Sequence, residues 1–148
     1  MRHDEVEILL IEDNPNDLEL TLRALKRTQL VKRIEVARDG AEALDFIFGS
    51  DPQDPRPPGR LPKLILLDLK LPKVDGLEVL QRLKSDTRTR QLPVIMLSTS
   101  REARDIAQSY ELGANSYIVK PVDFESFTET VRQVGQYWLS LNHPPQGS

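Results

Sequence analysis

The sequence lacks the residues on which several classes of protein chemistry depend. No cysteine occurs among its 148 residues, which excludes disulfides, a thiol nucleophile and thiolate metal ligands. Its two histidines, His3 and His143, lie near opposite ends of the chain, so no histidine-based metal cluster or catalytic triad is expected. The longest apolar runs have four residues, far fewer than the roughly 20 that a membrane-spanning helix needs.

Other absences narrow the choice of partners. No charged leader followed by an apolar stretch opens the chain, so no secretory signal is predicted and a cytoplasmic location is expected. The seven glycines form neither a GxGxxG nor a GxxxxGK loop, which disfavours nucleotide binding. A net charge of -3 argues against a dedicated nucleic-acid partner. With 39% hydrophobic and 29% charged residues, the composition predicts a soluble globular domain with no membrane partner.

The chain alternates short apolar runs with longer amphipathic segments. The apolar runs predict strands at 6–11, 34–37, 64–67, 94–97 and 116–119. The amphipathic segments predict helices at about 15–27, 41–48, 76–84, 101–112 and 124–141. This alternation predicts an α/β fold, (βα)5, in which a doubly wound, five-stranded parallel sheet has helices on both faces.

A proline-rich loop separates the two halves of this pattern. Residues 49–62 contain five of the 11 prolines, and the segment is too short to be a convincing linker between two domains. The whole chain, 1–148, is therefore predicted to be a single domain with its core at about 5–141. Only 28 residues follow Lys120, so no output domain is expected there.

Polar side chains follow four of the predicted strands, at the edge where an open parallel sheet binds ligands. They are Glu12, Asp13, Asp68, Ser98 and Lys120. Three carboxylates at one edge need a cation to neutralise them, and Mg2+ prefers carboxylate oxygens together with water and phosphate oxygens. The lysine and the serine suit phosphoryl oxygens, and a carboxylate can act as nucleophile to give an aspartyl phosphate. Asp68, alone at the end of a central strand, is the predicted acceptor.

Each of these residues has a purely structural explanation when it is considered alone. An acidic pair before Asn14-Pro15 is typical of a solvated helix start, and Asp68 alone would be a turn residue. Lys120-Pro121 alone is a strand end before a helix. These separate explanations do not predict five suitable groups at successive strand ends, so the phosphoryl site is the preferred interpretation.

The ordered set of motifs resembles the receiver domain of two-component response regulators over almost the whole chain. The matching elements are Glu12-Asp13, Asp68, Leu71-Pro72, Asp75-Gly76, Ser98, Tyr117 and Lys120-Pro121. The 30 positions from Asp68 to Ser98 and the 22 from Ser98 to Lys120 are also typical of receivers. The resemblance implies a flavodoxin-like (CheY-like) fold with strand order 2-1-3-4-5, and a signalling protein rather than an enzyme.

The resemblance also implies which residues bind the phosphoryl group and the metal. Asp68 would be the phosphoacceptor. Mg2+ would be bound by Asp13, Asp68 and the backbone carbonyl of Lys70, with Glu12 acting directly or through water. The protein would then catalyse only its own phosphorylation and dephosphorylation.

Further roles follow for residues at the ends of the last two strands. Ser98 would bind a phosphoryl oxygen after transfer, and Lys120 would bridge the phosphoryl group and a carboxylate. The Lys120-Pro121 bond would be a cis peptide, which aims the lysine into the site. Tyr117 would be a switch that turns inward when Ser98 moves toward the phosphate. By itself, Tyr117 fits a half-buried sheet tyrosine equally well.

Three residues close to Asp68 and Ser98 bear on the lifetime of the phosphoryl group. Thr99 stands where the family usually has a smaller residue, so access to Asp68 is expected to be restricted. Lys70 and Ser100 are predicted to alter the dephosphorylation rate, and Lys70→Asn is expected to change the lifetime of the aspartyl phosphate.

The proline-rich loop and the carboxyl end at 137–142 are similar to those of small stand-alone receivers that partner cyanobacterial-type phytochrome kinases. This closer resemblance implies a phytochrome-like sensor histidine kinase as phosphoryl donor, and a downstream protein or a histidine phosphotransfer protein as target. It also implies a homodimer through the face built from helix four, strand five and helix five.

The last predicted helix supplies candidates for that interface. One apolar stripe is predicted to face the core, and its members are Phe127, Val131, Val134, Trp138 and Leu141. Tyr137 and Leu139 fall off the stripe and are therefore the candidates for an exposed contact.

Two other functions fit parts of the sequence. A phosphatase that turns over through an aspartyl phosphate would place a second aspartate two positions after the nucleophile, where this chain has Lys70. A receiver-like adaptor or dimerisation module, which binds partners without being phosphorylated, is the stronger alternative. Such forms usually lack the phosphoacceptor, which Asp68 supplies here.

Overall fold

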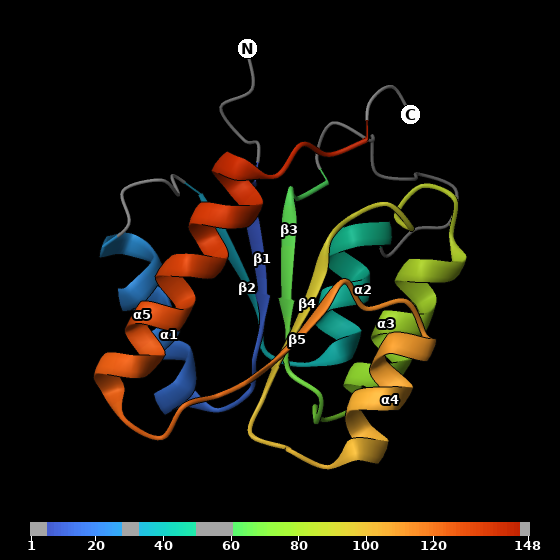
Figure 1. Ribbon diagram of the computed structural model, residues 1–148. Coiled ribbons are helices and arrows are strands. Elements are labelled where there is room, and N and C mark those ends of the chain that lie inside the picture. Colours follow the sequence, from blue (N-terminus) through green and yellow to red (C-terminus); the bar gives the residue numbers. More distant parts are fainter. Residues whose placement is uncertain (1–5, 28–32, 50–60, 146–148) are drawn as a thin grey trace.

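The structure is a computed structural model that describes residues 6–27, 33–49 and 61–145. Its centre is a five-stranded sheet in the order β2-β1-β3-β4-β5, as predicted (Figure 1). The strands are β1 (Ile8–Ile11), β2 (Ile34–Ala37), β3 (Leu64–Leu67), β4 (Val94–Ser98) and β5 (Ser116–Val119). Every neighbouring pair is parallel, which confirms the predicted doubly wound α/β fold.

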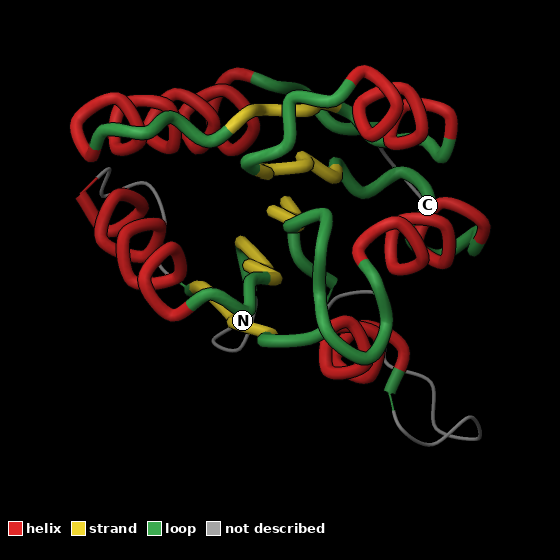
Figure 2. Tube along the Cα trace, turned by 90° about the horizontal axis from the view of Figure 1, so that it is seen from below, coloured by secondary structure: helices red, strands yellow, loops and turns green. Residues whose placement is uncertain are grey.

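Helices cover both faces of the sheet. They are α1 (Pro15–Arg27), α2 (Gly40–Phe48), α3 (Gly76–Ser85), α4 (Ala103–Glu111) and α5 (Phe124–Gln136). The helices α1 and α5 lie on one face, and α2, α3 and α4 lie on the other (Figure 2). None of these described helices is long and apolar enough to cross a membrane. Most of the predicted proline-rich loop, at 50–60, lies outside the described residues.

The central strands are apolar throughout because both of their faces are buried. Successive side chains of a strand point to opposite faces of the sheet. Leu9 and Ile65, which are paired in register, pack with the cluster beneath α2 and α3. Ile8 and Leu64 form the neighbouring pair and pack with the cluster beneath α1 and α5. Since β1 and β3 are in register at these positions, the residues that follow them emerge side by side at the carboxyl edge.

The carboxyl end of the last helix departs from the predicted pattern. After Gln136 the helix becomes a π-helical turn, Tyr137–Leu141, in which the Asn142 N–H donates to the Tyr137 carbonyl oxygen at 2.6 Å. The wider turn rotates Leu139 onto the core beside Trp138 and leaves Leu141 61% exposed. The predictions that Leu141 faces the core and that Leu139 is exposed were therefore wrong, whereas Tyr137 is exposed as expected.

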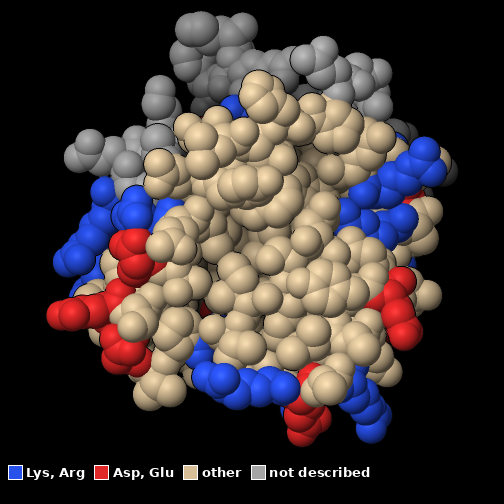
Figure 3. Space-filling model, viewed as in Figure 1, with Lys and Arg blue, Asp and Glu red and all other residues tan. Residues whose placement is uncertain are grey.

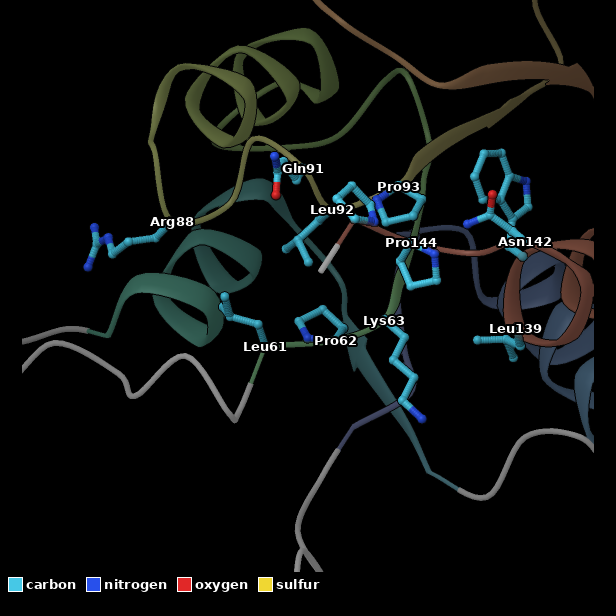
Figure 4. Close-up of a pocket in the computed structure, with 12 residues that line it drawn as sticks. Leu61, Pro62, Lys63, Arg88, Gln91, Leu92, Pro93, Leu139, Asn142 and Pro144 are labelled. Carbon is cyan, nitrogen blue, oxygen red and sulfur yellow. The ribbon is translucent and has the colours of Figure 1, made fainter. Parts of the chain in front are cut away.

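This carboxyl end also borders a hollow of about 450 Å³ at the amino edge of the sheet (Figure 4). Its walls include Trp138, Leu139 and Pro144 from the carboxyl end, with Pro62 and Pro93 from the residues that precede β3 and β4. Ligand sites of open parallel sheets lie at the opposite edge, so this hollow is separate from the predicted site.

Candidate functional site

The three predicted carboxylates lie together at the carboxyl edge of the sheet. Glu12 and Asp13 directly follow β1, and Asp68 directly follows β3, its paired neighbour. One oxygen from each of the three carboxylates lies within 4.8 Å of the others. Three convergent carboxylates are the donor set that a hard divalent cation such as Mg2+ prefers, so the residues present fit the predicted metal.

Glu12 is the most deeply buried member of the cluster, with a side chain that is 2% exposed. Its Oε1 accepts a hydrogen bond from the Lys120 Nζ at 2.6 Å, and its Oε2 accepts from the Asn14 N–H at 3.2 Å. Burial raises the pKa of Glu12 to about 7, because the lysine offsets only part of the burial and the charge of Asp68 acts in the same direction as burial. Glu12 therefore keeps its proton to a higher pH than an exposed glutamate does.

Lys120 reaches the cluster from the end of β5. Its backbone N–H donates to the Ser98 carbonyl oxygen at 2.7 Å, which fixes the lysine beside β4. Its Nζ donates to Glu12, and it lies 3.8 Å from the Asp68 Oδ2. Burial alone would lower the pKa of Lys120, but the carboxylates around it outweigh burial and raise the pKa above its usual value. The side chain is thus a fixed positive charge beside the predicted acceptor.

Asp17 is a site residue that was not predicted from the sequence. Its Oδ2 accepts a hydrogen bond from the Lys120 Nζ at 2.9 Å, and its side chain is 27% exposed. It stands four positions after Asp13, in the first turn of α1, where the Asn14 Oδ1 accepts from the Asp17 N–H. Acidic residues are common in the first turn of helices, so the spacing from Asp13 was the only available signal.

Three hydroxyl residues stand at the end of β4 and directly after it, at the same edge of the sheet as the carboxylates. Ser98 is buried, and its Oγ accepts a hydrogen bond from the Ser100 N–H at 3.2 Å. The Ser100 Oγ donates to the Asp105 Oδ2 at 2.6 Å and so belongs to the start of α4. Thr99, between them, is exposed. Ser98 is therefore a buried hydroxyl at the carboxyl end of β4, and its contact with a phosphoryl oxygen stays a prediction.

Tyr117, in β5, is hydrogen-bonded to the loop that follows β4. Its Oη donates to the Ser100 carbonyl oxygen at 2.9 Å, and its ring packs against the core cluster beneath α2 and α3. Its backbone N–H donates to the Tyr110 Oη at 3.1 Å, which joins the edge of β5 to α4. Tyr117 is thus half-buried and bonded to the residue two positions after Ser98, so both interpretations of this tyrosine remain compatible with its position.

The loop after β3 holds the predicted acceptor in place. The Asp68 Oδ1 accepts a hydrogen bond from the Leu69 N–H at 2.7 Å. Gly76 closes the loop, because a Cβ at this position would stand 2.3 Å from the Asp68 carbonyl oxygen and 2.4 Å from that of Leu69. Lys70 is exposed, and its backbone carbonyl as a metal ligand stays a prediction.

One prediction for the site was wrong. The described residues contain no cis peptide bond, so the Lys120-Pro121 bond is trans. An X–Pro bond favours the trans form by about 0.5–1 kcal/mol unless its surroundings select the other isomer. Here the ammonium group reaches Glu12 from a trans peptide, with its backbone anchored to Ser98.

The fold and the cluster together define a class of signalling domain, in which a doubly wound sheet presents carboxylates, a lysine and a hydroxyl at one edge. The family model of the response regulator receiver domain matches residues 8–132, and the chain belongs to this family. Receiver domains act in two-component systems with histidine kinases, and they bind Mg2+ through acidic residues such as those of this cluster.

The chain is similar to two curated proteins over about nine-tenths of its length. The probable methanogenesis regulatory protein FilR2 of Methanothrix harundinacea is 43% identical, over 93% of this chain and 86% of FilR2. The response regulator Rcp1 of Synechocystis is 37% identical, over 89% of this chain and 88% of Rcp1.

Two solved structures extend this similarity to three dimensions. The Mn2+-bound form of Rcp1 has a TM-score of 0.82, and the match covers 95% of this chain and 99% of that one. The phosphorylated cyanobacterial phytochrome response regulator RcpA has a TM-score of 0.83 at 38% identity, over 96% of this chain and 99% of that one. The chain thus resembles cyanobacterial phytochrome response regulators, as its sequence predicts.

Proposed function

We propose that this chain is a single-domain response regulator that accepts a phosphoryl group from a histidine kinase on Asp68, in a reaction that requires Mg2+. The observation that carries the proposal is the convergence of Glu12, Asp13 and Asp68 within 4.8 Å, with the Lys120 ammonium beside them. The match covers 88% of Rcp1 and 99% of RcpA, both response regulators, which supports this assignment.

The chemistry follows from the surroundings of Asp68. An Asp68 carboxylate oxygen would form a bond to phosphorus while the P–N bond of a phosphohistidine breaks, and the leaving imidazole would take the electron pair. When bound, Mg2+ would neutralise charge on the phosphoryl oxygens. Lys120 would donate to one phosphoryl oxygen, and Ser98, at the end of the adjacent strand, would donate its hydroxyl to another.

The signal would leave the site through the loop after Ser98. The Ser98 hydroxyl now accepts from the Ser100 N–H, so its movement toward a phosphoryl oxygen would release that bond. The Ser100 carbonyl oxygen in turn accepts from Tyr117, which couples the loop to β5. A shift at Asp68 would thereby reach the surface that α4, β5 and α5 form.

That surface is the proposed site of protein contact. The face over β5, α4 and α5 carries few charged side chains, which gather at its margins (Figure 3). Tyr110 and Phe124 are exposed on it, and Tyr137 is exposed at the end of α5. A homodimer through this face, and a downstream protein or histidine phosphotransfer protein as its target, are the partners that we propose.

A phytochrome-type kinase is the proposed phosphoryl donor, because RcpA, a phytochrome response regulator, matches the chain over 96% of its length. The test is to mix the chain with an autophosphorylated phytochrome kinase and follow the label on both proteins. The expected result is transfer to the wild type and none to Asp68→Asn. Stable binding without transfer would instead support the adaptor function.

The residues proposed to tune the phosphoryl lifetime differ in their surroundings. The Lys70 and Thr99 side chains are exposed beside the site, whereas the Ser100 hydroxyl is engaged by Asp105. We therefore expect Lys70→Asn to change the decay rate of the aspartyl phosphate more than Ser100→Ala does, measured as loss of the phosphorylated form over time. Equal decay of Lys70→Asn and the wild type would remove Lys70 from this role.

A further inference from the structure

The Lys120 ammonium is shared among three carboxylates, and one of them belongs to no predicted metal site. Glu12 and Asp17 accept hydrogen bonds from the Nζ at 2.6 and 2.9 Å, whereas the Asp68 Oδ2 is 3.8 Å away. The lysine is therefore bound on the α1 side of the cluster, at a distance from the predicted acceptor that is too long for a hydrogen bond.

We propose that Asp17 is a positioning residue that holds Lys120 away from Asp68 until a phosphoryl group arrives. The inference rests on the proposed phosphorylation of Asp68. With Asp17 as its partner, the ammonium leaves the Asp68 oxygens to the metal. When the phosphoryl group is present, the lysine exchanges Asp17 for a phosphoryl oxygen while it keeps its bond to Glu12.

The exposure of the two partners supports this division of roles. The Glu12 side chain is 2% exposed, so its charge depends on the lysine and cannot be released at low cost. The Asp17 side chain is 27% exposed, so water can solvate its carboxylate once the lysine leaves. Glu12 is thus the permanent partner of Lys120, and Asp17 is the exchangeable one.

Within the described part of the chain, the Asp17 carboxylate has Lys120 as its hydrogen-bond and ion-pair partner. The backbone of Asp17 makes hydrogen bonds at the start of α1: its N–H donates to the Asn14 Oδ1, and its carbonyl oxygen accepts from the Thr21 hydroxyl. The carboxylate bonds to Lys120. Replacement of Asp17 by asparagine therefore leaves these backbone hydrogen bonds in place and weakens the interaction between residue 17 and the Lys120 ammonium.

The proposal predicts opposite changes in two affinities of Asp17→Asn. In the variant, Lys120 moves toward the Asp68 Oδ2 and competes with Mg2+, so the Mg2+ affinity falls by about three- to tenfold. At saturating Mg2+, the lysine no longer has to leave a charged partner. The affinity for beryllofluoride, a phosphoryl analogue, then rises by a similar factor.

Both affinities are measured on the intact chain by titration, with backbone amide chemical shifts as the readout. Glu19→Gln is the matched control, because it removes the same charge from α1 at a residue that pairs with Arg23 on the surface. Asp17→Glu keeps the charge and is expected to stay near the wild type in both titrations.

The outcomes separate the inference from the function on which it rests. Weaker Mg2+ binding with tighter beryllofluoride binding, in Asp17→Asn alone, supports the inference. If Asp17→Asn matches Glu19→Gln, or if both of its affinities fall together, Asp17 has only a structural role and the inference is wrong. If the wild type itself does not bind beryllofluoride with Mg2+, the proposed function fails first.

Discussion

Lys120→Met is expected to lower the free energy of unfolding of the metal-free protein by about 3–5 kcal/mol at pH 8. The reason is that Glu12 is buried and depends on the lysine for its nearest positive charge. Removal of the lysine leaves a buried carboxylate that must either stay charged without a partner or take up a proton. Phosphoryl acceptance by Asp68 is expected to fall as well, since the ammonium beside it is lost.

The pH dependence of this loss of stability shows whether it comes from the unpaired charge of Glu12 or from lost packing of the lysine side chain. The pKa of Glu12 in the folded protein, about 7, is above its usual 4.5, so the folded state binds the proton more tightly than the unfolded state. Stability from this group is therefore greatest at acidic pH and declines as the pH rises from about 4.5 through 7. Without Lys120 the pKa rises further, and the decline extends to higher pH.

Denaturant unfolding at pH 5.5 and pH 8 measures the effect, with about 10 mM EDTA present to keep the site free of metal. Lys26→Met, which removes an exposed lysine at the end of α1, is the matched control. We expect a small difference between Lys120→Met and the wild type at the acidic pH and a large one at pH 8. An equal loss at both pH values would show that packing, and not the buried charge, explains the effect.

Gly76→Ala is expected to destabilise the protein by about 3 kcal/mol and to impair phosphoryl acceptance. The added Cβ would stand 2.3 Å from the Asp68 carbonyl oxygen, which is backbone and cannot move aside without shifting the end of β3. That shift would displace the acceptor from the other two carboxylates. Denaturant unfolding and acetyl phosphate labelling would measure the two consequences.

Gly135→Ala is a matched control for this substitution. The position lies inside α5, and a Cβ there would meet only the Leu25 Cδ2, at an ordinary contact distance of 3.8 Å. Alanine is favoured over glycine inside a helix by about 1 kcal/mol, so Gly135→Ala is expected to be neutral or stabilising. Equal destabilisation by both substitutions would contradict the specific role of Gly76.

The fold and most of the site could be predicted because buried strands appear in the sequence as apolar runs, and the site residues directly follow those runs. The apolar runs at 8–11 and 64–67 have no polar member, which is typical of parallel strands covered on both sides. Since ligand sites of such sheets lie where the strands end, Asp68 and Lys120 could be placed at one edge before their distance was known.

The features that could not be predicted depend on contacts between distant segments. Lys84 is an example, because its Nζ donates to the carbonyl oxygens of Arg90 and Leu92 and to the Asn115 Oδ1, and thereby joins the end of α3 to two loops. Asp17 has the same character, since its partner lies 103 positions away. The π-helical turn at 137–141 spans too few residues for its period to be distinguished from that of an α-helix.

The role of Asp68 as acceptor can be tested by the intact mass of the chain after incubation with acetyl phosphate, with and without Mg2+. Asp68→Asn is the control, because it keeps the size of the side chain and removes the nucleophilic carboxylate. We expect one added phosphoryl group on the wild type, dependent on Mg2+, and none on the variant. An adduct that persists in Asp68→Asn, or no adduct on a folded wild type, would contradict the role of Asp68 as the acceptor.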